Sequence, residues 1–303
     1  MNGKTVIVIG NGFDLDLGWH TSYKDFYDVH KGWNMHKSNH DDLFQYVINC
    51  VADNWFDFER TFFDYAIHRA DVGLDTEFYV RDIQDYYSFK DQLFRFIAER
   101  SKQPIKESSF AYRLLKAYIN GCKRFQHNAN MFLNWFSFNY TPLDSIANGI
   151  DSEATFSYIP VHGTIAKNNI IFGIHDDDRI LPEYRPLLKS MDDNYNSQGI
   201  VKALLESNLI IFFGLSMGYI DSIYFKKMFN SLADGNISPS LANKEIFFIT
   251  KDVETKKAIK NNLLDMGLQL QILFNMSNVD FIYTSDRDDY NNSAKFESLL
   301  SRL

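Results

Sequence analysis

The sequence predicts an α/β protein with a mostly parallel sheet, and two observations support this fold class. The runs Thr5–Ile9 and Leu209–Phe213 are apolar without polar alternation, as in strands buried on both faces of a parallel sheet. Strand-like and helix-like patterns alternate from about residue 131 onward, an order that places helices on both faces of such a sheet. The 303 residues are expected to form a single α/β domain, 1–303, with a large helical insertion after its first strand.

The insertion is predicted for residues 23–125, where apolar residues recur at helical spacing, as in Leu43, Val47 and Val51. Thr141 and Pro142 predict a later helix start, with threonine as the N-cap and proline as the first helical residue. The other predicted elements are strands at 131–138, 155–161, 169–172, 244–250 and 279–283, and helices at 200–206, 221–232 and 253–264.

Composition and charge disfavour several classes of protein. A formal net charge of −8 argues against non-specific binding to nucleic acid. The two cysteines, Cys50 and Cys122, form no CxxC pair, so a zinc ribbon is excluded and a reducing compartment is favoured. We expect a cytoplasmic protein, because the N-terminus has no export signal and no apolar run is long enough to span a membrane.

The first candidate site follows the first strand, at Gly10, Asn11, Gly12 and Asp14. Two glycines let the backbone turn tightly and let a ligand approach, and a helix that starts here would direct free N–H groups at a phosphate. The run lacks the third glycine of the dinucleotide fingerprint and the lysine of a P-loop. An ordinary strand-to-helix turn is the alternative.

Three further polar positions follow predicted strands. Asn139 follows the second strand and His162 the third, and Gly214 with Ser216 follows the strand 209–213, with Asp221 close behind. Ligands of open α/β sheets bind at the carboxyl ends of strands, and an imidazole can accept a proton near neutral pH. A turn asparagine, a structural histidine and a capped turn are the alternatives for these positions.

Two other candidates carry weaker patterns. His175 with the acidic run Asp176–Asp178 could bind a divalent cation, but a solvated acidic loop explains the same residues. Trp55, Phe58 and Glu59 are expected at a helix start, where Glu59 is either a helix-dipole partner or a pocket carboxylate.

Taken in order, these motifs resemble the AbiH family of phage abortive-infection proteins. The resemblance rests on six motifs in the same order along nearly the whole chain. They are Ile9–Leu15 with Thr21–Tyr23 and Phe26, Trp55 with Phe58 and Glu59, Phe138–Thr141, His162–Gly163, Phe172–Gly173, and Gly214–Ser216 with Asp221.

The same motifs are similar, more distantly, to the sirtuin-like NAD-binding superfamily, which implies a Rossmann-like sheet. That similarity implies phosphate contacts at Gly10 and Gly12, ribose and water positioning by Asn139, and a base at His162. Gly214 and Ser216 would be further cofactor contacts. Thr141 stands where sirtuins carry an aspartate, Asp14 stands near where they carry a serine, and the zinc module is absent. The resemblance therefore implies NAD cleavage to nicotinamide rather than protein deacetylation.

The expected function is anti-phage abortive infection by a protein that binds NAD and hydrolyses it to nicotinamide and ADP-ribose without a metal. Two alternatives remain open: a nucleotide-sensing switch without turnover, and a metal-dependent nuclease that uses the loop at 175–178. The expected partners are an NAD-type small molecule, a phage-derived trigger and a second copy of the chain, but neither a membrane nor nucleic acid.

Overall fold

The computed structural model describes residues 4–30, 43, 46–47, 58–72, 76–125, 133–153, 156–195, 197, 199–233 and 244–303. The chain divides into two compact units. The sheet unit comprises 1–19, 103–161 and 196–303, and the helical unit comprises 20–102 and 162–195. The helical segment predicted at 23–125 is thus shared between them, because α6 (Phe110–Phe125) belongs to the sheet unit.

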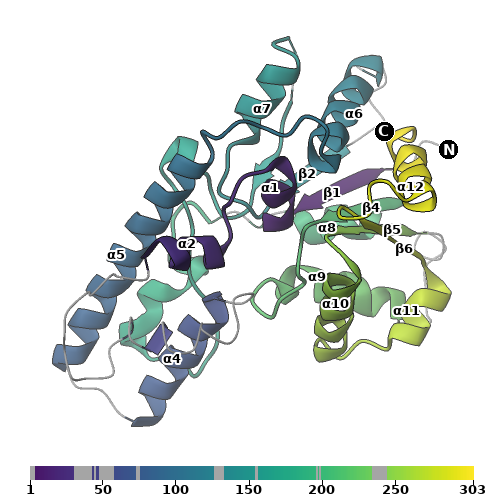
Figure 1. Cartoon of the computed structure of the whole chain (residues 1–303). Coiled ribbons are helices and arrows are strands. Elements are labelled where there is room, and N and C mark those ends of the chain that lie inside the picture. The colour runs from purple at the N-terminus through teal and green to yellow at the C-terminus, as the bar shows by residue number, and fades with distance from the viewer. Residues whose placement is uncertain are drawn as a thin grey trace. The chain divides into compact units, whose positions relative to one another are not determined.

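The sheet unit contains a six-stranded parallel sheet, which confirms the predicted fold class (Figure 1). The strand order is β3-β2-β1-β4-β5-β6, so the chain builds outward from β1 in one direction and then in the other. The strands are β1 (Thr5–Ile9), β2 (Leu133–Ser137), β3 (Ile159–Pro160), β4 (Leu209–Phe213), β5 (Glu245–Thr250) and β6 (Asn278–Tyr283).

Helices cover both faces of this sheet, as the absence of polar alternation in β1 and β4 requires. Alternate strand residues such as Ile7, Trp135 and Ile211 pack into one core with α1 (Asn11–Leu17), α6, α7 (Leu143–Ile150) and α12 (Tyr290–Leu300). The opposite face, which includes Phe212, packs against α9 (Ser222–Ala233). Figure 1 shows α9 with α10 (Val253–Asp265) and α11 (Leu270–Met276) on the side away from α6 and α12.

The helical unit is held by aromatic side chains. Its helices are α2 (Tyr23–His30), α4 (Phe58–Val72) and α5 (Thr76–Arg100), with the 3-10 helices η1 (Ile165–Lys167), η2 (Pro182–Leu187) and η3 (Lys189–Met191). The rings of Phe62, Phe89 and Phe172 pack with centroids 5.0–5.3 Å apart. None of the helices in the described ranges is both long and apolar enough to cross a membrane.

The predicted strand at 169–172 is wrong. Residues 169–172 form no strand, because Phe172 is buried among the rings of the helical unit and its carbonyl accepts a hydrogen bond from the Tyr86 hydroxyl at 2.6 Å. An apolar run buried by helices has the same sequence pattern as one buried in a sheet. The third strand is also shorter than predicted, with only Ile159 and Pro160 paired to β2.

The other strands and helices predicted after residue 125 are confirmed to within a few residues. Several predicted positions lie outside the described residues, namely Cys50, Val51, Trp55, 131–132 and 155.

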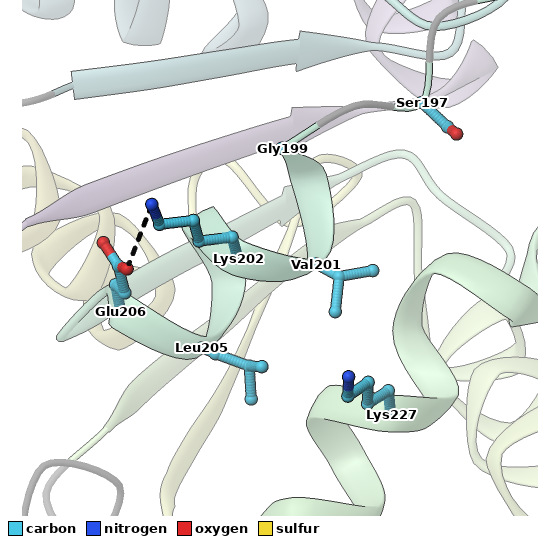
Figure 2. A pocket seen from close by; sticks show the side chains of 7 residues that line it. All are labelled: Ser197, Gly199, Val201, Lys202, Leu205, Glu206 and Lys227. Carbon is cyan, nitrogen blue, oxygen red and sulfur yellow. Dashed lines mark ion pairs between the residues drawn. The ribbon is translucent and has the colours of Figure 1, made fainter.

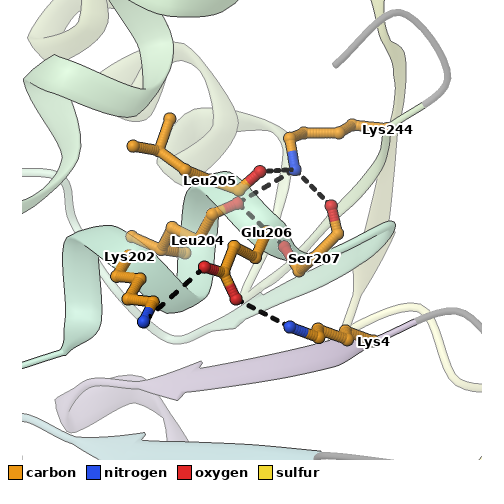
Figure 3. A network of polar contacts seen from close by, with 7 residues as sticks. All are labelled: Lys4, Lys202, Leu204, Leu205, Glu206, Ser207 and Lys244. Carbon is orange, nitrogen blue, oxygen red and sulfur yellow. Dashed lines mark hydrogen bonds and ion pairs between the residues drawn. The ribbon is translucent and has the colours of Figure 1, made fainter. Parts of the chain in front are cut away.

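The side chain of a buried lysine, Lys244, binds the C-terminal end of the short helix α8 (Ile200–Glu206) in the sheet unit (Figure 3). The ammonium of Lys244 donates to the carbonyls of Leu204 at 3.0 Å and Leu205 at 2.8 Å, and also to that of Ser207. These carbonyls carry the negative end of the helix dipole, so a cation there is favourable. Lys244 is fully buried, and burial lowers the pKa of its ammonium to about 8.

Candidate functional site

The loops after β1 and β4 touch through their backbones. The N–H of Gly12 donates to the carbonyl of Gly214 at 2.9 Å, and the N–H of Gly10 donates to Phe213 at the same distance. A Cβ on Gly12 would lie 2.5 Å from the Cα of Gly214, and Gly214 has a φ of +64° with its own Cβ position 2.4 Å from Gly12. Both glycines are therefore required by this close approach, whatever else they do.

The same hydrogen bonds limit what the first loop can offer a ligand. The N–H groups of Gly10 and Gly12 donate within the protein, and the N–H of Phe13 donates to Gly10 at 2.9 Å. Phosphate contacts at Gly10 and Gly12 stay a prediction, and any such contact would need other donors. The half-buried side chain of Asn11 and the exposed side chain of Ser216 belong to these two loops.

A buried carboxylate joins the β1 loop to the β2 loop. Asp14, in α1, is 1% exposed and accepts a hydrogen bond from the Asn139 amide at 2.8 Å. The Thr141 hydroxyl lies 3.0 and 2.9 Å from its two oxygens. Asn139 also donates to the carbonyl of Gly10 at 3.0 Å. We call Asp14, Asn139 and Thr141 with the Gly10 carbonyl the Asp14 clasp.

The clasp defines which atom of Asn139 could serve a ligand. Both N–H bonds of its side-chain amide point at Gly10 and Asp14, so ribose or water positioning would fall to the side-chain oxygen. The clasp also corrects a sequence prediction. Thr141 is not the N-cap of α7, because Pro142 takes that position and the threonine hydroxyl donates to Asp14 instead.

The loop after β4 is fixed on both sides of Ser216. Met217 is buried with a φ of +57°, and the carbonyl of Ser216 accepts a hydrogen bond from Asn262 at 2.8 Å. Asp221 is half-buried at the start of α9, where its carbonyl accepts from the Tyr224 N–H. The exposed Ser216 side chain is thus carried on a constrained backbone.

His162 belongs to the helical unit and lies in a buried ionisable cluster. Its Nε2 is 3.2 Å from Nζ of Lys189, and that ammonium is 2.8 Å from Oε2 of Glu59. His162 and Lys189 are 4% exposed and Glu59 is 8% exposed. The predicted pocket carboxylate at Glu59 thus pairs with a lysine that the sequence did not single out, since Lys189 has no distinctive spacing.

Gly163, next to His162, has a structural explanation. Its φ is +71°, and a Cβ there would lie 1.9 Å from the carbonyl oxygen of Asn169. The side chain of Asn169 accepts the Thr164 N–H at 2.9 Å and closes the turn. This glycine allows the chain to turn back on itself directly after His162.

The acidic loop at 175–178, the alternative metal site, makes contacts within the protein. Asp177 accepts two hydrogen bonds from Arg179, both 2.8 Å long, which hold the pKa of its carboxyl below its usual range. Asp176 accepts from Ser190, and His175 stacks on Phe63 with centroids 4.7 Å apart. Within the described ranges no group of three His, Cys, Asp or Glu side chains is placed to hold a metal ion.

A surface hollow of about 430 Å³ lies along α8 and contains none of the predicted site residues (Figure 2). Val201 and Leu205 form its apolar part, and Lys202, Glu206 and Lys227 its charged part. Glu206 is held by Lys4 at 2.7 Å.

The sheet unit therefore brings together Gly10, Asp14 and Asn139 in one hydrogen-bonded cluster, and Gly12 and Gly214 in one backbone contact. His162 belongs to the other unit.

Comparison with known proteins gives one result that bears on function. The family model described as "Bacteriophage abortive infection AbiH" matches residues 6–241, which include all of these candidate residues. No curated protein matches the chain.

Proposed function

This chain belongs to the AbiH family of bacteriophage abortive-infection proteins, and we propose that it acts by binding NAD or a close relative at the carboxyl ends of β1, β2 and β4. One observation carries the proposal. The strand order β3-β2-β1-β4-β5-β6 reverses direction between β1 and β4, and open parallel sheets bind nucleotides in the crevice outside such a reversal.

The residues at this reversal suit a nucleotide. Asn11 and Ser216 offer side-chain donors in the two adjoining loops, and the oxygen of Asn139 can accept from a ribose hydroxyl. The Asp14 clasp fixes Asn139, so that a ligand meets a preformed acceptor. Asp221, which follows β4, would supply a second acceptor in addition to the side-chain oxygen of Asn139.

The proposed reaction is hydrolysis of NAD to nicotinamide and ADP-ribose. The bond between the nicotinamide nitrogen and the ribose carbon breaks, water supplies the new hydroxyl oxygen, and one proton is released. Asn139 would orient the water and the ribose. His162 belongs to the helical unit, and its predicted part in this reaction stays a prediction. Variants at Asn139 and His162 test the two assignments separately.

The first experiment incubates the purified protein with NAD, with and without phage lysate, and measures nicotinamide and thermal stability. Nicotinamide release supports the proposal. Stabilisation by NAD without release favours the nucleotide-sensing switch, and neither effect in either condition contradicts both. Cleavage of DNA or RNA that depends on added magnesium would favour the nuclease alternative.

A matched pair of variants tests the location. Ser216→Asp adds a negative charge to the exposed loop after β4, and we expect it to weaken NAD binding about fivefold or more through repulsion of the phosphates. Ser157→Asp adds the same charge to an exposed loop at the amino end of β3, the opposite edge of the sheet, and should leave binding unchanged. Equal effects of the two variants would contradict a site at the carboxyl edge.

A further inference from the structure

The buried cluster of Glu59, Lys189 and His162 contains three ionisable groups in one hydrogen-bonded row. Glu59 comes from α4, Lys189 from η3, and His162 from the segment that enters the helical unit. The Lys189 ammonium bridges the other two, at 2.8 Å from the carboxylate oxygen and 3.2 Å from Nε2 of the imidazole. The charge and tautomer of His162 therefore depend on which group holds the proton between Nζ and Nε2.

Intrinsic basicity places that proton on the lysine. The ordinary pKa values of lysine and histidine differ by about four units, a factor of roughly ten thousand in proton affinity. The carboxylate of Glu59 adds to this preference because it contacts the lysine directly. Lys189 is therefore an ammonium that donates to Nε2.

A donated hydrogen bond at Nε2 fixes the rest of the ring. Nε2 must carry a lone pair, so in the neutral imidazole the proton is on Nδ1. Uptake of a second proton at Nε2 would place two cations 3.2 Å apart in a buried site.

We propose that Lys189 and Glu59 are positioning residues that hold His162 as a neutral imidazole protonated on Nδ1, so that His162 acts as a hydrogen-bond donor and not as a base. Any part of this donor in NAD cleavage rests on the proposed function. The tautomer itself is a property of the protein without ligand.

Other ionisable groups face this cluster and do not reverse the assignment. Burial, with the positive charges of Arg60 and Lys189, lowers the pKa of His175, although Asp177 opposes this, so His175 adds little positive charge. Burial raises the pKa of the Tyr86 hydroxyl, which also faces Glu59 and Asp192, so Tyr86 stays neutral.

The primary test is NMR of the full chain labelled with ¹⁵N-histidine, without NAD, between pH 6 and 8. The His162 signals are assigned from their loss in His162→Gln. We expect Nδ1 to carry the proton and Nε2 to be unprotonated throughout this range. A proton on Nε2, or protonation of the ring within this range, would overturn the proposal.

Variants separate positioning from simple stabilisation. Lys189→Met removes the donor and leaves Glu59, so the pKa of His162 should rise by about one unit or more. Lys90→Met is the matched control, since Lys90 also pairs with a carboxylate of the helical unit, Asp192 at 3.1 Å, and should not change His162. An unchanged His162 in folded Lys189→Met would contradict the proposal.

If Lys189→Met does not fold, the double variant Glu59→Gln/Lys189→Met removes both charges. In that protein a proton on Nε2 of His162 should become detectable. A His162 tautomer identical to that of the wild type would contradict the role of Lys189 in fixing it. These spectra need no NAD. If the protein does not bind NAD, the proposed function is contradicted and this inference is not. If the protein cleaves NAD but carries a proton on Nε2 of His162, this inference is contradicted and the proposed function is not.

Discussion

Lys189 of the helical unit and Lys244 of the sheet unit are both buried, but different partners meet their charges. Lys189 contacts a carboxylate and an imidazole, two groups that can themselves change protonation. Lys244 donates to main-chain carbonyls at the end of α8, which cannot. A buried ammonium that is bound by backbone carbonyls stabilises the fold. A buried ammonium that contacts ionisable side chains can also determine which of those side chains carries a proton.

The largest effect is expected from breaking the ion pair of the helical unit. Lys189→Met should lower the free energy of unfolding by about 3–5 kcal/mol, because it leaves the Glu59 carboxylate buried without this cation. Urea unfolding measures the loss. The double variant Glu59→Gln/Lys189→Met should recover much of it, and equal losses in the two proteins would show that the charge of Glu59 is not what Lys189 compensates.

The Asp14 clasp extends this comparison to a buried carboxyl group, because Asp14 accepts hydrogen bonds from the neutral side chains of Asn139 and Thr141. Thr141→Val keeps the shape of the side chain and removes a hydroxyl donor to a carboxylate, which should cost about 1.5–3 kcal/mol. Thr250→Val is the control, because its hydroxyl makes no hydrogen bond to any described residue, and it should cost less than 1 kcal/mol. Similar losses in both proteins would show that the clasp contributes nothing particular to stability.

The pH dependence of stability should reveal Lys244. Its folded pKa of about 8 lies below the ordinary 10.5, so between these values the unfolded chain binds more protons than the folded one. The free energy of unfolding should therefore rise with pH across this window, by about 1–3 kcal/mol relative to Lys244→Met. A difference between the two proteins that stays constant from pH 7 to 10 would show that Lys244 titrates normally in the folded state.

The smallest effect is expected from a lysine that is only partly buried. Lys90 pairs with Asp192 at 3.1 Å but is 24% exposed, so Lys90→Met should change the free energy of unfolding by about 0–1 kcal/mol. A loss as large as that of Lys189→Met would mean that burial does not explain the contrast among these lysines.

The sequence was sufficient for the sheet but not for the polar clusters. Thr5–Ile9 and Leu209–Phe213 are buried at every position, so their composition alone identified them as interior strands. Residues 170–172 are also apolar but form no strand, because the sequence does not say whether a sheet or a set of aromatic rings buries them.

Long-range partners explain the remaining errors. The Thr141 hydroxyl satisfies Asp14, 127 residues away, and no local pattern distinguishes that contact from a helix cap. Lys189 follows a leucine and precedes a serine in an irregular segment, where a lysine is ordinarily exposed. Its burial depends on Glu59, 130 residues earlier in the chain.

The contact between Gly12 and Gly214 also constrains the order of events during protein synthesis. The sheet unit is assembled from three separate stretches of chain. Among the described strands, β1 pairs with β2, which begins at Leu133, and with β4, which begins at Leu209. On the ribosome, β1 must therefore remain without its ladder partners while the first stretch of the helical unit, 20–102, emerges. The apolar segment Thr5–Ile9 is then an unpaired strand that is prone to aggregation, until translation passes Gly214 and the two loops can pack against each other.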